Sequence, residues 1–505
     1  MSDLHHSPSS TISSPQRFEL SGSARTFLLS TIGLGLLCLI WIFFHDDQFH
    51  TRFWTDILHN SVFFTGIAIF SLFFYAANIV ALGGWIVTFK RIWEAYAQFL
   101  VVGLILMLII AGGLYLGYHH LYHWNDATLR TTDKVIIGKS GFLSKNFYTG
   151  FSILAMGTWI FLAKKIRAIS LDEDVNGTSA FTHHIQLRKY SSMALPLIGF
   201  MSAACIWLWV MSLDAHWYST MFAWYSSASL FVSMLVLTIG IILYMKSRGY
   251  LAEVSTEHLH DIAKFTFAFS IFWMYLWFSQ YMLIWYSNIG EETTYFRERF
   301  DHYKVLYYAN LILNFLLPFL ILMRNDTKRK VGTLMLVAAL VFFGHWIDFF
   351  QMIKPGTLHT AHELIEHRTE VGQIKPLETK SLEVAHESLP IIKDSTEGEV
   401  TTMHGTETTK ENISKAEKDT VKTEGSMASH EMKEGIGGEE GHAEETHETE
   451  SAFVAGFTLP GLLDIGVLLG FLAGFLLFVF NEIGKASLQP KKDPYYAESL
   501  HHHVQ

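Results

Sequence analysis

Two short strings of the sequence combine carboxylate, imidazole and aromatic side chains at the end of an apolar run. They are LDAHWY at 213–218 and GHWIDFF at 344–350, and each contains an aspartate, a histidine and a tryptophan. Imidazole and carboxylate groups can take up and release protons, and with tyrosine hydroxyls they can hydrogen-bond the carbonyl groups of a small ring. The two strings are therefore candidate sites for proton transfer or for binding a polar head group.

Helical spacing sorts these residues into sets. Residues three or four positions apart share a helix face, so we expect His345 to face the same way as Asp348, and Asp214 the same way as Tyr218. His216, two positions from Asp214, is expected to face a neighbouring helix or the membrane interface. The alternatives are a capped helix end and an interfacial aromatic belt, which need no chemistry.

Further polar residues interrupt other apolar runs. Gln280 and Tyr281 lie in WFSQYMLIWY, Tyr225 ends the string SLDAHWYSTMFAWY, and Asp464 lies in LPGLLDIGVLLG. A charge in hydrocarbon costs at least about 2.5–3.5 kcal/mol, so an intramembrane carboxylate is a functional candidate. We expect Asp464 about three turns from the outer end of its helix. The alternative is a carboxyl group that is neutral or paired for packing.

Ten apolar runs must position these residues, and each is about as long as the roughly 20 residues that a helix needs to cross a bilayer. They lie at about 24–44, 60–89, 96–118, 146–163, 191–212, 220–246, 262–288, 304–323, 331–353 and 453–480. Without the first and last runs, two groups of four remain, and four is even, so corresponding helices cross in the same direction. The sequence therefore predicts an all-α integral membrane protein with ten transmembrane helices. It consists of two parallel four-helix bundles, at 60–212 and 220–353, and two flanking helices.

The distribution of lysine and arginine predicts the orientation. Short segments on the side of the two termini hold 19 of these residues, and the short loops on the other side hold 8. The positive-inside rule then places the polar N-terminus (1–23) and the tail (481–505) in the cytoplasm. Residues 1–23 lack the features of a cleaved signal peptide. We expect a multi-pass protein of a bacterial inner membrane.

The segment 354–452 differs from the rest of the chain in composition. It holds 22 acidic and 10 basic residues and no Phe, Tyr or Trp, in a chain that is 15% aromatic. Such a segment cannot bury enough apolar surface to offset the entropy of ordering, so we expect an outer loop that is disordered or loosely helical. Its eight histidines include HELIEH at 362–367, which lacks the spacing of the H-E-x-x-H zinc motif. Its charge could attract a basic partner such as a small cytochrome.

The residue inventory limits the possible cofactors. Two cysteines, both within apolar runs, exclude a cysteine-ligated iron–sulfur cluster and a C-x-x-C-H haem attachment. His345 is the one histidine well inside a span, so a b-type haem with two axial histidines is not expected. We predict no metal site and no catalytic residue, and a redox role would use a partner's cofactor. Apolar walls with a few hydrogen-bonding groups suit a quinone or a proton path.

The string at 212–225, with the ten-helix arrangement and the lack of cofactor ligands, resembles the NrfD/polysulfide-reductase-like membrane subunits. Within that family it is most similar to the ActF subunits of alternative complex III, a quinol:cytochrome c oxidoreductase. The resemblance covers about 20–355 and 453–490, whereas the segment 354–452 has no counterpart. It implies a second NrfD-like membrane subunit, an iron–sulfur subunit, and multihaem and monohaem c-type cytochromes as partners. The implied substrate is menaquinol, with menaquinone as its product.

The resemblance leads to two functional expectations. We expect a respiratory-chain subunit that supports electron transport from menaquinol, conducts or helps to translocate protons, and is not catalytic alone. The alternative is a secondary transporter or ion channel, because parallel repeats and intramembrane acids occur in transporters as well. A purely structural anchor would need no intramembrane acids. No nucleic-acid partner is expected.

Overall fold

The computed structural model describes residues 17–178, 181–370 and 457–502, with the backbone alone for 362–370. Across this described part, ten helical segments are long and apolar enough to cross a membrane, which confirms the predicted all-α membrane fold. The ten spans are α1 (Gly22–Phe44), α2 (Thr51–Val80), α3–α4 (Lys90–Gln98 and Leu100–Leu116), α7 (Lys145–Asn176), α8 (Thr182–Trp209), α9 (Thr220–Ser247), α10 (Thr256–Ser287), α12–α13 (Lys304–Leu311 and Leu317–Leu322), α14 (Val331–Glu370) and α17 (Leu462–Gly484).

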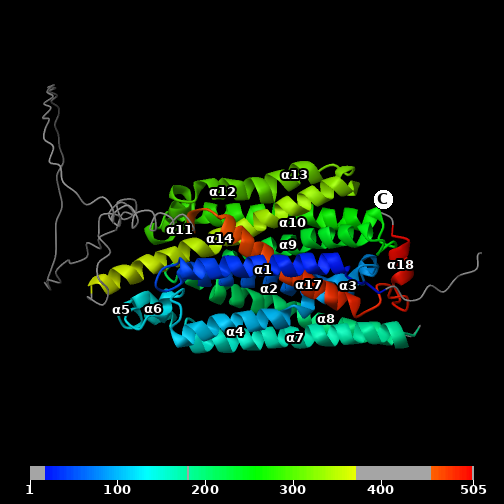
Figure 1. The fold of residues 1–505 in the computed structure, drawn as a ribbon, viewed down its shortest axis with the longest axis horizontal. Helices are drawn as coiled ribbons and strands as arrows, with labels where there is room; N and C mark the ends of the chain where they lie inside the picture. The colour runs from blue at the N-terminus through cyan, green and yellow to red at the C-terminus, as the bar shows by residue number, and fades with distance from the viewer. Residues whose placement is uncertain (1–16, 179–180, 371–456, 503–505) are drawn as a thin grey trace, which may run out of the picture.

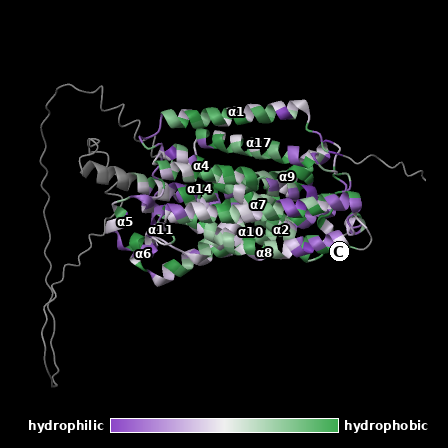
Figure 2. Cartoon of the chain, turned by 90° about the horizontal axis from the view of Figure 1, so that it is seen from below, coloured by the Kyte–Doolittle hydropathy of each residue, from purple (hydrophilic) through white to green (hydrophobic). Residues whose placement is uncertain are grey.

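The spans pack as two groups of four with a flanking pair (Figure 1). In the first group α4 and α8 each contact α2 and α7. In the second group α9 contacts α10 and α14, while α12–α13 contacts both of these. The groups meet where α2 packs against α9 and α14. Helices α1 and α17 lie side by side at the edge of the molecule (Figure 2).

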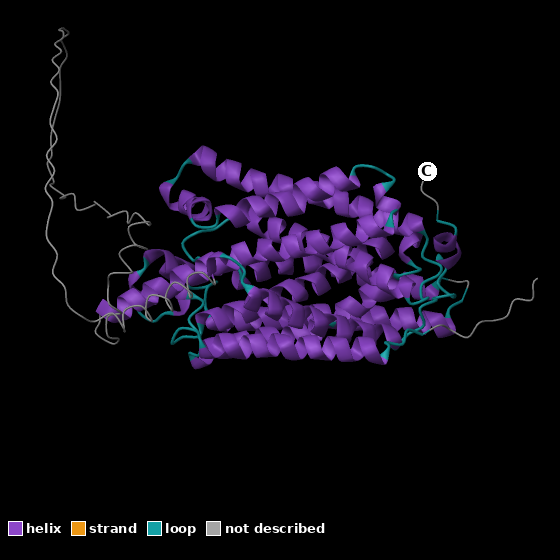
Figure 3. Ribbon diagram, turned by 45° about the horizontal axis from the view of Figure 1, so that its top comes forward, coloured by secondary structure: helices purple, strands orange, loops and turns teal. Residues whose placement is uncertain are grey.

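The connections gather at the two ends of the spans (Figure 3). We call one end the terminus side: it holds residues 17–21, the segment 485–502 and the short helix α18 (Tyr496–Leu500). The other end, the loop side, holds 45–50, 117–144, 210–219 and 288–303. Three short helices lie there, namely α5 (Leu129–Thr132), α6 (Lys134–Lys139) and α11 (Gly290–Asp301).

Hydrophobic residues dominate the middle of the spans, and hydrophilic residues collect towards their ends (Figure 2). Helices α2 and α9 are the most buried of the spans, and both carry polar side chains in their buried part. Because these two helices face protein on nearly all sides, their polar groups can be satisfied by neighbouring helices and need not meet lipid.

The flanking pair is held by a close approach of two backbones. A Cβ atom on Gly35 of α1 would lie 2.6 Å from the Cα atom of Gly470 on α17, so a larger residue does not fit there. Small residues that let helices approach are the usual basis of helix association in lipid. The rest of α1 exposes large apolar side chains, including Phe27, Leu37 and Phe44, as a lipid-facing helix does.

Three boundaries differ from the prediction. Helix α14 continues from the predicted end at 353 to Glu370, and residues such as Thr357 and Ala361 are buried, so the first part of 354–452 is helical and packed. Its remainder, 371–452, lies outside the described residues. Helix α17 begins at Leu462 and not near 453, which places Asp464 in the first turn and not three turns inside. The predicted tail packs back onto the bundle, where Ser499 Oγ donates to the carbonyl of Trp85 at 3.1 Å.

Candidate functional site

The side chain of Asp348 is the centre of a buried polar cluster on the loop-side half of the second bundle. Its carboxylate has no exposed surface and accepts hydrogen bonds from the Tyr225 hydroxyl, from Asn310 Nδ2 at 2.7 Å and from Trp273 Nε1 at 2.9 Å. These donors come from α9, α12 and α10, so the four helices of the bundle meet at one carboxylate. All three partners donate, which suits a carboxylate group that only accepts.

His345 lies one helical turn before Asp348 and on the same face of α14, as the spacing predicts. It is fully buried, and its Nδ1 is 2.9 Å from Ser229 Oγ on α9. Its Nε2 has no hydrogen-bond partner among the described residues. A buried polar atom without a partner is uncommon and needs an explanation, which makes His345 a functional candidate.

A π-helical turn in the eighth span shapes the wall of this cluster. Residues Ile312–Leu316 form a π turn between α12 and α13, and Asn314 there donates a hydrogen bond to Asn310, which in turn binds Asp348. A Cβ on Gly344 would overlap the Asn314 amide, so a glycine is needed where α14 packs against the π turn. Such π turns occur often at functional sites.

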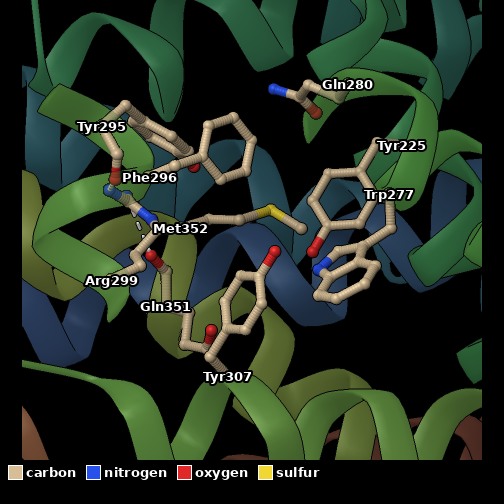
Figure 4. A pocket seen from close by; sticks show the side chains of 9 residues that line it. All are labelled: Tyr225, Trp277, Gln280, Tyr295, Phe296, Arg299, Tyr307, Gln351 and Met352. Atoms are coloured by element: carbon tan, nitrogen blue, oxygen red, sulfur yellow. Dashed lines mark hydrogen bonds between the residues drawn. The ribbon is translucent and has the colours of Figure 1, made fainter. Parts of the chain in front are cut away.

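A cavity opens beside the Asp348 cluster (Figure 4). Its empty space of about 320 Å³ includes open solvent at the mouth, and about 20 Å³ is free for the centre of a water-sized molecule. Its walls combine aromatic rings with a few polar groups: Tyr225, Trp277, Gln280, Tyr295, Phe296, Arg299, Tyr307, Gln351 and Met352. Tyr225 connects the two features, because it lines the cavity and its hydroxyl donates to Asp348.

Arg299 supplies a fixed positive charge at the cavity wall. Its guanidinium lies 3.3 Å from the centre of the Tyr295 ring and donates to the carbonyl groups of Tyr295 at 2.7 Å and Gln351 at 3.1 Å. Burial raises the pKa of Tyr295 to about 12 although Arg299 opposes the shift. Burial also raises the pKa of Glu298, against the attraction of the same guanidinium. Trp217 stacks on Tyr295 with ring centres 3.8 Å apart.

The structure brings together Tyr225, Gln280, His345 and Asp348 from the predicted site residues. Tyr281 does not line the cavity itself; its ring packs on the wall residue Phe296 at 5.3 Å and on Phe300 at 5.6 Å.

The predicted pairing of Asp214 with Tyr218 on one helix face is wrong. Helix α8 ends at Trp209 and is followed by a single 3₁₀ turn, Met211–Leu213, so the residues beyond it are not helical. Asp214 is half-buried at the rim of the bundle, where its charge acts on Tyr295 and Glu298. Tyr218 is 60% exposed. Its ring lies beneath the Lys139 ammonium at 5.1 Å.

His216 turns away from the bundle towards the short helices of the loop side. Its Nε2 lies 2.6 Å from Asp133 Oδ2, and Lys139 Nζ donates to the carbonyl of Ala215 at 2.7 Å. His123 lies beside the pair, with its ring centre 5.1 Å from that of His216. His216 faces another element, as expected, but helical spacing is not the reason, because residues 214–219 are not helical.

Asp464 belongs to a second buried charge cluster on the loop side. Its carboxylate is 2.8 Å from Arg52 Nη2 and 3.2 Å from Lys354 Nζ, and Lys354 is also 2.5 Å from Asp56. Two basic and two acidic groups thus join α2, α14 and α17. Asp464 therefore fits the alternative in which its carboxyl group is paired for packing, because a buried charge needs a partner of opposite charge.

A third polar cluster lies on the terminus side and escaped the sequence analysis. Arg91 binds Glu94 at 2.5 Å, and the Glu94 carboxylate accepts from Tyr75 at 2.9 Å and from Ser170 at 2.7 Å. Lys90 pairs with Asp493 of the C-terminal segment at 2.5 Å.

Comparison with known proteins does not assign the chain to a family. No protein-family model matches the chain, and no curated protein matches it significantly. The functional argument therefore depends on the residues and their arrangement.

Proposed function

We propose that this chain is a membrane subunit, without a redox cofactor of its own, of a respiratory quinol:cytochrome c oxidoreductase of the alternative complex III type. In this role it supports menaquinol oxidation by accepting and conducting protons. The observation that carries the proposal is the buried Asp348 carboxylate, held by three donors and linked through Tyr225 to an aromatic cavity.

The link provides a proton route. Oxidation of a quinol releases two electrons and two protons, and a base near the hydroxyl speeds proton transfer. The Tyr225 oxygen can accept a quinol proton while its own proton passes to Asp348. His345 lies one turn before Asp348 on α14, with Nδ1 2.9 Å from Ser229 Oγ and Nε2 without a partner among the described residues. In this proposal Tyr225, Asp348 and His345 carry the proton away from the cavity in turn.

The lining of the cavity has the chemical character that a quinone head group requires. Its free interior of about 20 Å³ holds about one water molecule, so a quinone ring enters only with a movement of the wall side chains, and its isoprenoid tail stays in lipid. Aromatic walls suit the ring faces, and Gln280, Tyr307 and Arg299 can hydrogen-bond the ring oxygens.

The electrons must leave through another subunit. The sequence holds two cysteines, Cys38 and Cys205, and neither can form part of a multi-cysteine cluster site. The proposed acceptors are the iron–sulfur and c-type cytochrome subunits expected from the resemblance, together with a second NrfD-like chain. The proposed location is a bacterial inner membrane with both termini in the cytoplasm.

Purification from native membranes tests this proposal. A tagged chain extracted in a mild detergent should carry along c-type haem, visible in the reduced absorption spectrum, and polypeptides with cysteine-rich cluster motifs. Recovery of the chain alone, at full yield and without haem, would refute a role as a respiratory subunit.

One observation favours ion transport as a second candidate. The π turn Ile312–Leu316 interrupts a spanning helix next to Asp348, and interrupted helices beside a buried charge are typical of transporter sites. Reconstituted alone in liposomes, a transporter would move protons or another ion without quinol, whereas the proposed subunit would not.

A further inference from the structure

The loop side carries a cluster of possible metal ligands that the proposed quinol chemistry does not use. His123, Asp133 and His216 each direct one ligand atom into a common space, and these atoms lie within 4.8 Å of one another. His123 lies 10 positions before Asp133 in the sequence, and His216 lies 83 positions after it. Such spacing does not indicate a metal site. We propose that these three residues bind one divalent transition-metal ion, represented by Zn²⁺.

The donor set fits zinc chemistry. Zn²⁺ takes imidazole nitrogen at about 2.0–2.1 Å and carboxylate oxygen at about 2.0–2.2 Å, so two of its ligand atoms stand at most about 4 Å apart. The largest separation of 4.8 Å here closes by a small side-chain rotation. The side chain of His216 is 43% exposed and can make that movement, whereas His123 is buried. Three protein ligands leave a fourth position for water.

The carboxylate is oriented by its own helix. Asp133 Oδ1 accepts from the backbone N–H groups of Val135 at 2.7 Å and Ile136 at 3.1 Å, because Asp133 caps α6. This leaves Oδ2 directed at His216, 2.6 Å away. Desolvation raises the pKa of Asp133, but the hydrogen bonds from His216 and the two amides outweigh it and lower the pKa below its ordinary value. Partners that fix a ligand in this way strengthen metal sites.

The surrounding charges are compatible with a cation. Lys139 interacts electrostatically with Asp133, but desolvation lowers the pKa of Lys139, and its ammonium donates to the Ala215 carbonyl. Asp214 adds a negative charge near Lys139. The bound ion would tie the 123–133 segment to the loop that carries Trp217, which stacks on cavity residue Tyr295.

Histidine footprinting of the purified full chain tests the proposal. Diethyl pyrocarbonate modifies accessible histidines, and peptide mass spectrometry reads each site separately, so the other histidines of the chain do not obscure the result. With ZnCl₂ at ten times the dissociation constant, occupancy should lower modification of His216 about tenfold. His183 is the matched control, because it pairs with Asp172 at 2.9 Å without a third ligand among the described residues.

Asp133→Asn supplies the decisive variant. Asparagine also caps helices well, so α6 should be retained while the anionic ligand is lost. The proposal predicts that Zn²⁺ no longer protects His216 in this variant and leaves His183 equally reactive in both proteins. Equal modification of His216 with and without Zn²⁺ in the wild type, or protection that persists in Asp133→Asn, would overturn the site. The proposed quinol function does not depend on either result.

Discussion

The Tyr225 hydroxyl on α9 donates a hydrogen bond to the Asp348 carboxylate on α14, and both side chains are buried inside the second bundle. Tyr225 also lines the cavity, so its side chain connects the cavity to the Asp348 carboxylate. This contact makes the proton route testable with a substitution that removes one oxygen atom.

Tyr225→Phe should leave the complex assembled and lower quinol-dependent turnover by about 10²-fold, since a positioned proton-transfer group contributes roughly 10²–10⁴-fold. The assay is quinol:cytochrome c reduction in purified complex. Tyr281→Phe is the control, because Tyr281 does not line the cavity and makes no hydrogen bond to Asp348 among the described residues. If both variants retain wild-type turnover, the hydroxyl plays no part in proton transfer.

The sequence could predict the spans and part of the site. His345 and Asp348 share a face as expected, because their helix continues without interruption through both positions. The same argument failed for Asp214 and Tyr218, because an apolar run does not reveal that α8 ends at Trp209. Helical periodicity is reliable inside an element and weak at its ends.

The partners of Asp348 and Asp464 could not be predicted, because they come from other helices. Asn310 and Trp273 lie in apolar runs where each has an ordinary structural explanation, and Lys354 lies at the start of a segment with the composition of a solvated loop. The fixed position of Lys354 arises from the continuation of α14, which local composition did not indicate.

Lys354→Met should destabilise the protein by about 3–5 kcal/mol, because it leaves Asp56 and Asp464 as buried charges without their shared cation. Unfolding by SDS in mixed micelles measures this free energy. Lys485→Met removes a 64% exposed ammonium from Glu482 and should cost within about 0.5 kcal/mol. Equal stability of the two variants would show that the ion pairs of Lys354 with Asp56 and Asp464 do not stabilise the fold.

Gly35→Val should separate α1 from α17 and lower the thermal midpoint of the solubilised protein, because a side chain at this position meets the Gly470 backbone. Overpacking typically costs about 1–3 kcal/mol. Gly33→Val is the matched control two positions away, where a Cβ meets nothing within 4 Å. An unchanged midpoint for Gly35→Val would mean that the two helices do not approach closely in the membrane.

The orientation can be checked with reporter fusions. Alkaline phosphatase, which is active only outside the cytoplasm, should be inactive when fused after residue 505 and active when inserted near residue 420. The positive-inside rule gives this assignment from the uneven distribution of lysine and arginine. The reverse pattern of activity would place Asp348 and its cavity on the cytoplasmic half of the membrane.

The most direct test of the proposed function is the turnover of complex that carries Asp348→Asn. Asparagine keeps the size of the side chain but cannot take up the proton, and Asp301→Asn, at the end of α11 where the side chain is 51% exposed, is the control for the same chemical change. We predict normal assembly, judged by co-purified haem, with quinol:cytochrome c turnover at least about 100-fold lower in Asp348→Asn and unchanged in Asp301→Asn. A fully assembled Asp348→Asn complex with wild-type turnover would contradict the account.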